Sequence, residues 1–224
     1  MTTVFLVRHG LTAQTGRVLY GRTDGIELDH RGRAQAAALV ERFEGVRVTA
    51  IYSSPLERCV QTIEPLADAR RLATRTDEAL IEMDAGSWTG RTLRQVRRAK
   101  AWETVQRSPS AFAFPGGGES FPDAQARVVA GIERIARRHR RGAVVIATHG
   151  DIVRIAIADF TAAPLDAFQR IVIDTAGVSV VELGGPRPHV LLVNDTGGLA
   201  RFRAAPTPPW DAAGRDRRGA KVRG

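Results

Sequence analysis

The chain has 224 residues, 43% of them hydrophobic and 25% charged, which suits one α/β domain with a large core. Its only cysteine, Cys59, excludes an intramolecular disulfide, and no apolar run approaches the roughly 18 residues of a membrane span. The N-terminus lacks a basic region followed by a long apolar stretch, so we expect a cytoplasmic protein with no membrane partner.

The formal net charge is +9, and almost all of the positive charge comes from arginine, because Lys100 and Lys221 are the only lysines. Such an excess is able to attract nucleic acid, a membrane or an anionic substrate. The arginines are scattered in runs such as "RRHRRG" (137–142), which favours solvated helix faces. We therefore do not expect nucleic acid as the main partner.

Hydrophobic patterns alternate between strand-like runs and helical spacing along the chain. The expected strands are 4–7, 50–52, 143–147, 170–173, 178–182 and 190–193. The expected helices are 32–43, 56–69, 93–106 and 121–139, with Ser120 and Asp123 at capping-box spacing before the last. Strands that alternate with helices predict an α/β fold, a three-layer α/β/α sandwich with a mainly parallel central sheet.

The composition changes at Ala204, after which the chain is rich in Pro, Ala, Gly and Arg and has no apolar period. We therefore predict one domain over residues 1–203 and a flexible basic tail over 204–224. The oligomeric state is left open, and a homodimer is compatible with the sequence.

Two expected strands end in a histidine followed by a glycine, in "LVRHG" (6–10) and "ATHG" (147–150). In an open α/β sheet, ligands bind beyond the carboxyl ends of the strands, and glycine lets the backbone turn sharply and approach a ligand. Arg58, in "SSPLERCVQT" (53–62), is expected in the first turn of a helix, where an anion is favoured. Together with Arg8 it forms a plausible clamp for a tetrahedral dianion.

This combination suits phosphoryl transfer, which needs a nucleophile in line, cations on the equatorial oxygens and a proton for the leaving alkoxide. A neutral imidazole at His9 is able to attack phosphorus, and the nearby arginines disfavour its protonated form. The segment "LIEMDAGSWTG" (80–90) supplies two candidate acids, Glu82 and Asp84. The residues alone do not choose between them.

Five segments, "LVRHGLT", "YSSPLERCVQT", "LIEMDAGSWTG", "FPGGGES" and "VIATHGD", stand in the order and spacing of the histidine phosphatase superfamily. The chain resembles this phosphoglycerate-mutase-like family over roughly residues 3–195. The resemblance implies that His9 is the phosphorylated nucleophile and that Glu82 is the proton donor. It also implies that three residues bind the phosphoryl group: Arg8, Arg58 and His149.

We add four further residues to the predicted substrate-binding set: Gly150, Thr15, Gly21 and Arg22. No cofactor is expected. No metal site is expected either, because the two clamp arginines would repel a divalent cation from the two histidines and the glutamate.

The departures from the family pattern indicate which acceptor takes the phosphoryl group. Leu11 and Thr15 stand where relatives often have a glutamate and an asparagine. The residues with which mutases hold a phosphorylated glycerate are replaced by Met83, Ala85 and "RTL" (91–93). Water is then the expected acceptor, so we predict a phosphatase that acts on a small phosphorylated metabolite. A cofactor-dependent phosphomutase is the alternative, and an arginine-rich nucleic-acid-binding protein is a lesser one.

Overall fold

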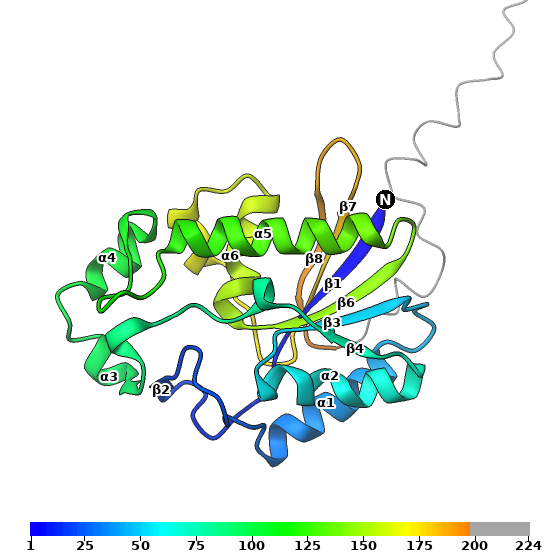
Figure 1. Ribbon diagram of the computed structural model, residues 1–224, viewed down its shortest axis with the longest axis horizontal. Coiled ribbons are helices and arrows are strands. Elements are labelled where there is room, and N and C mark those ends of the chain that lie inside the picture. Colours follow the sequence, from blue (N-terminus) through cyan, green and yellow to red (C-terminus); the bar gives the residue numbers. More distant parts are fainter. Residues whose placement is uncertain (198–224) are drawn as a thin grey trace, which may run out of the picture.

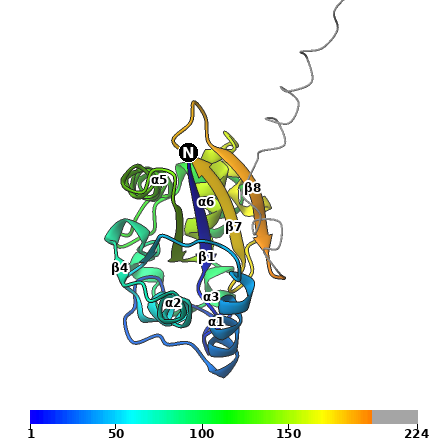
Figure 2. The ribbon, with the colours of Figure 1, turned by 90° about the vertical axis from the view of Figure 1, so that its right-hand side faces the viewer.

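A computed structural model describes residues 1–197 of the chain (Figure 1). Its centre is a six-stranded sheet in the order β4-β3-β6-β1-β7-β8. Neighbouring strands pair in parallel from β4 to β1, whereas β7 is antiparallel to both of its neighbours. The strands of this sheet are β1 (Thr2–Arg8), β3 (Ala50–Ser53), β4 (Thr74–Thr76), β6 (Ala143–Thr148), β7 (Val178–Leu183) and β8 (His189–Asp195). The predicted mainly parallel sheet is confirmed, and Figure 2 shows β8 at its edge.

Helices cover both faces of this sheet: α5 and α6 lie above the strands in Figure 1 and α1 and α2 below them. A small ribbon of β2 (Val18–Leu19) and β5 (Arg91–Thr92) stands apart from the main sheet. The helices are α1 (His30–Arg42), α2 (Glu57–Arg70), α3 (Leu93–Val96), α4 (Trp102–Arg107), α5 (Phe121–Arg138) and α6 (Gly150–Phe160). Short 3₁₀ turns are η1 (Glu78–Leu80), η2 (Gly86–Trp88), η3 (Pro109–Ala111) and η4 (Leu165–Arg170). None of the helices in this described part is long and apolar enough to cross a bilayer.

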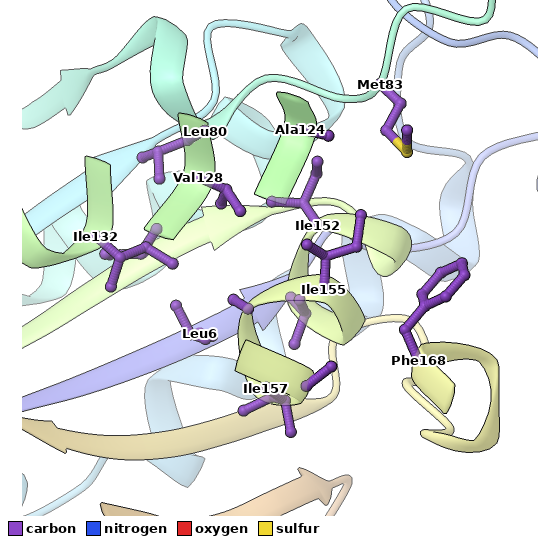
Figure 3. Close-up of a cluster of buried hydrophobic side chains, with 14 of the residues drawn as sticks. Leu6, Leu80, Met83, Ala124, Val128, Ile132, Ile152, Ile155, Ile157 and Phe168 are labelled. Atoms are coloured by element: carbon purple, nitrogen blue, oxygen red, sulfur yellow. The ribbon is translucent and has the colours of Figure 1, made fainter. Parts of the chain in front are cut away.

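The central strand β1 is buried on both faces. Val4 and Leu6 pack into the core beneath α5 and α6, and Phe5 and Val7 pack into the core against α1 and α2. Figure 3 shows Leu6 among apolar side chains of α5 and α6. Burial on both faces explains the uninterrupted apolar run at the start of the chain, since such a strand has no solvent-facing side.

The helix starts follow from side-chain caps. Asp29 accepts a hydrogen bond from the backbone N–H of Gly32, so α1 begins at His30, two residues before the predicted start. Ser120 Oγ accepts from the backbone N–H of Asp123 at 3.1 Å, and α5 begins at the next residue, Phe121. The predicted cap is confirmed.

The predicted helix 93–106 is wrong, because α3 ends at Val96 and α4 begins only at Trp102. A capping box of Thr92 and Gln95 starts α3. Arg94 lies three and four residues before Arg97 and Arg98, and like charges at these spacings repel on a helix surface.

The predicted strand 170–173 is also wrong. Residues 165–170 form η4, and the next residues are irregular, with Ile173 buried and Val172 exposed. Helix α6 was not predicted from the sequence. Its side chains are buried on almost all sides. Periodicity cannot separate a fully buried helix from a strand, which is why the sequence did not reveal it.

Candidate active site

The ends of β1, β3 and β6 meet at one edge of the sheet, as predicted. Because β1 pairs with β6 so that Arg8 lies opposite Thr148, the residues that follow the two strands, His9 and His149, become neighbours. Their ring centroids lie 5.4 Å apart, and the rings are inclined at 63°. The end of β3 reaches the same place, since Ser54 Oγ lies 2.8 Å from His149 Nε2.

The two glycines that follow these histidines are needed for close packing within the protein. A Cβ at Gly10 would lie 2.8 Å from the carbonyl oxygen of Gly32 in α1. A Cβ at Gly150 would lie 3.0 Å from Nε of Arg8. Any larger residue would therefore displace either the backbone that carries His9 or the guanidinium beside it.

His9 is buried, with only 2% of its surface exposed, and its Nδ1 lies 2.8 Å from the carbonyl oxygen of Gly10. A carbonyl only accepts, so Nδ1 carries the proton and the lone pair of a neutral ring is on Nε2. Burial and the charge of Arg58 lower the pKa of His9 to about 3, and Arg8 adds a smaller effect. The prediction attributed the neutral imidazole to the nearby arginines, but desolvation of the buried ring lowers its pKa more than they do.

Two guanidinium groups flank His9. Arg58, in the first turn of α2, is fully buried, donates to the carbonyl of Gly21 at 2.8 Å and lies over the ring of Tyr20. Arg8 donates to the carbonyl of Ile173 at 2.6 Å. Within residues 1–197 neither side chain forms an ion pair, and Nε of each is buried without a hydrogen-bond partner. Two cations that lack a counter-charge favour an anion at this place.

His149 is fully buried at the start of α6. Its Nδ1 lies 3.7 Å from Glu82 Oε2, and Cys59 Sγ lies 3.5 Å from its Nε2. Burial, Arg58 and His9 hold the pKa of His149 well below its usual value, so the ring is neutral. Burial also raises the pKa of the Cys59 thiol to about 12, as expected for an unreactive structural cysteine.

Glu82 lies in the irregular segment that follows η1, and its carboxyl group lines the pocket next to His9. Burial and the nearby charge of Asp151 raise the pKa of Glu82 to about 7. The charge of Arg58 and a hydrogen bond from the backbone N–H of Met83 to the Glu82 carboxylate act in the opposite direction. The other candidate acid, Asp84, instead accepts from the backbone N–H of Gly86 and supports a turn of the loop.

Arg22 was predicted to contact the substrate, but it does not line the pocket. Arg22 Nε donates to the carbonyl of Glu82 at 2.8 Å, and its terminal nitrogen pairs with Glu119 at 3.0 Å. Arg127 of α5 pairs with both oxygens of Glu119 and donates to the carbonyls of Ala79 and Ile81. These three side chains hold the loop that carries Glu82.

The pocket above His9 has a volume of about 140 Å³. Of the remaining predicted residues, Thr15, Gly21 and Gly150 line it, although the Thr15 hydroxyl already bonds to Thr12. Arg58 and His149 lie behind the surface. Leu11 is also outside the lining, and its backbone N–H donates to Gln35.

Sequence reasoning missed several lining residues. Asp151 and Arg154 lie on the first turns of α6 and form an ion pair of 2.9 Å inside the pocket. The only signal was their position one and four residues after the "THG" motif, on what proves to be a helix. The apolar part of the wall comes from residues distant in the chain: Val18, Leu19, Tyr20, Met83, Ala85 and Phe114. Within residues 1–197, no three His, Cys, Asp or Glu side chains form a group able to hold a metal ion.

Comparison with known proteins places this geometry in a family. The model of the histidine phosphatase superfamily (branch 1) matches residues 4–196. The chain is 30% identical over 208 residues to phosphoserine phosphatase 1 of Hydrogenobacter thermophilus, which covers 90% of this chain and 96% of that protein.

Two solved structures agree with this placement. YhfR of Bacillus stearothermophilus is 32% identical and has a TM-score of 0.80, with 86% of this chain and 96% of that chain covered. A mycobacterial glucosyl-3-phosphoglycerate phosphatase is 25% identical and has a TM-score of 0.76, over 86% of this chain and 98% of that chain. Since the family model spans most of the sequence, the chain belongs to branch 1 of the histidine phosphatase superfamily and is a phosphatase.

Proposed function

We propose that this chain hydrolyses phosphomonoesters of small metabolites through a phosphohistidine on His9. The observation that carries the proposal is the hydrogen bond of 2.8 Å between His9 Nδ1 and the carbonyl of Gly10. It leaves the lone pair on Nε2, in a pocket of about 140 Å³ that accommodates a phosphoryl group. Burial keeps the ring neutral and therefore nucleophilic.

In the first step Nε2 of His9 attacks phosphorus while the bond from phosphorus to the leaving oxygen breaks. Arg8 binds the equatorial oxygens from the pocket lining. Arg58 and His149 lie behind that lining and support the same oxygens, Arg58 with its charge and the neutral His149 ring with one hydrogen-bond donor. Glu82, whose pKa is about 7, gives its proton to the leaving alkoxide.

In the second step the Glu82 carboxylate takes a proton from water, which attacks the phosphohistidine. The nitrogen–phosphorus bond breaks, phosphate leaves, and both His9 and Glu82 return to their starting protonation states. The two named phosphatases in the comparisons carry the names of different substrates, phosphoserine and glucosyl-3-phosphoglycerate. We therefore propose a small phosphorylated metabolite without naming it.

Replacing His9 with alanine tests the nucleophile. We expect His9→Ala to reduce turnover of an aryl phosphate by more than about a thousandfold. Acid quenching of the wild-type enzyme during turnover of a ³²P-labelled substrate should give an acid-labile phosphoprotein that the variant does not form. His30→Ala is the matched control, since His30 is exposed on α1, and it should retain both properties. Substantial turnover by His9→Ala would exclude the proposed nucleophile.

A further inference from the structure

A groove lined by arginines adjoins the active-site pocket. It has a volume of about 520 Å³ and lies over β2, β5 and α3. We define this arginine groove by the residues that line it: Gly16, Arg17, Thr92, Leu93, Arg94, Arg97 and Arg98. From its position and charge we propose that it binds a second anionic group on the substrate, at the end of the molecule opposite the phosphoryl group that is removed. This inference rests on the proposed phosphatase function.

The groove and the pocket share one wall. Gly16 lines both; the next residue, Arg17, lines the groove, and Val18 and Leu19 line the pocket. The β2–β5 ribbon joins the two hollows, because Val18 pairs with Thr92 and the backbone N–H of Leu93 donates to the carbonyl of Arg17 at 2.9 Å. Figure 1 shows β2 and α3 side by side. One small molecule is therefore able to extend from the pocket across this wall into the groove.

The charge of the groove is unbalanced. Its lining contains four arginines and no acidic residue. All four arginine side chains are exposed, and in the part of the chain that the structure describes none takes part in an ion pair or a hydrogen bond. Elsewhere on the surface, Arg107 pairs with Glu103 and Arg137 with Glu133 at helical spacing.

Guanidinium groups held around one hollow without counter-charges repel one another, and an anion with two negative charges relieves that repulsion. Arginine also binds phosphate through two parallel hydrogen bonds, which suits a terminal phosphate group. The four arginines line one hollow, and the helix predicted over 93–106 is interrupted at two of them, Arg97 and Arg98. We therefore assign the groove to a substrate with a second phosphate.

Alkane-α,ω-diol bisphosphates provide a direct probe. Their kcat/KM is compared with that of alkyl monophosphates of the same chain length, from two to eight carbons, by measuring phosphate release. Two equivalent ends give a statistical factor of about two, and we expect the wild-type preference to exceed it by about tenfold at one optimal length. That length measures the span between the pocket and the groove.

The triple variant Arg94→Gln, Arg97→Gln, Arg98→Gln removes three charges from the groove. We expect its bisphosphate preference to fall to about the statistical factor of two. The matched control is Arg137→Gln, Arg138→Gln, Arg140→Gln, which removes the same number of charges at the C-terminal end of α5 and in the turn that follows it, and it should keep the preference. The control separates a local site from attraction by the net positive charge of the whole protein.

A wild-type preference of only about twofold at every length would overturn the inference, as would an equal preference in the groove variant. Equal losses in both triple variants would also overturn it, because the effect would then come from net charge alone. The proposed function fails separately: it is refuted if the wild-type enzyme releases phosphate from neither series.

Discussion

At the scale of single residues, two buried side chains have pKa values displaced in opposite directions. Burial and Arg58 lower the pKa of His9 to about 3, and burial and Asp151 raise that of Glu82 to about 7. Between these values the histidine is neutral and the carboxyl group is protonated, so the candidate nucleophile and the candidate acid are in their active forms over the same range. Such a divergence is typical of paired catalytic groups.

We predict a bell-shaped dependence of kcat/KM on pH. Activity should rise as pH increases through about 3, where His9 loses its proton, and fall as pH increases through about 7, where Glu82 loses its own. In Glu82→Gln the alkaline fall should disappear. This variant should lose about a hundredfold or more with alkyl phosphates but much less with nitrophenyl phosphate.

The matched control for this prediction is Asp84→Asn. Asp84 is the other carboxylate of the loop, and an amide oxygen is still able to accept from Gly86. It should keep the alkaline fall and the wild-type dependence on leaving group. If the fall persisted in Glu82→Gln, another group would have to supply the proton.

At the scale of elements, an irregular segment that carries a candidate catalytic group is held by arginine side chains. The segment after η1 has no strand partner at Glu82, and buried backbone carbonyls need donors. Arg127 of α5 supplies two, at Ala79 and Ile81, and Arg22 supplies one at Glu82 itself. Glu119 joins both arginines, so the position of Glu82 depends on a residue 37 places further along the chain.

We predict that Glu119→Gln acts on catalysis through position. The two guanidinium groups would lose a charged partner, which should cost about 2 kcal/mol of unfolding free energy in urea denaturation. It should also lower kcat about tenfold for poor leaving groups and less for good ones, with KM little changed. Glu133→Gln breaks the more exposed pair with Arg137. It should change the free energy of unfolding by no more than about 0.5 kcal/mol and leave kcat unchanged. A loss of stability with an unchanged leaving-group dependence would reduce Glu119 to a structural role.

At the scale of the whole molecule, the candidate site lies within the part of the chain that the family model matches. The residues that line the pocket around His9 lie between Arg8 and Arg154 in the chain. The predicted tail over 204–224 lies outside the described residues, and its five basic and two acidic residues contribute +3 to the formal net charge of +9.

We predict that a chain ending at residue 203 keeps kcat/KM for an aryl phosphate within about twofold at 0.15 M salt, where long-range charge effects are largely screened. At low salt the shortened chain should lose part of its rate, because a less positive protein attracts a dianion less strongly. Circular dichroism and thermal melting would verify that it folds. A large loss of activity at 0.15 M salt would move the domain boundary beyond 203.

The sequence by itself determined the fold class and which strand ends carry chemistry. Each of these features is local: a strand buried on both faces is a continuous apolar run, and the residue after it is the one at the sheet edge. For that reason His9 and His149 could be identified from two short segments, and the structure places them side by side.

Only the tertiary structure decided the rest, because contacts between distant residues leave no periodic signal in the chain. It showed that Arg22 holds the Glu82 loop with Glu119, and that Asp151 and Arg154 face the pocket. It also showed that burial lowers the pKa of His9 more than the neighbouring arginines do. Desolvation depends on everything that surrounds a side chain, and that environment exists only once the chain has folded.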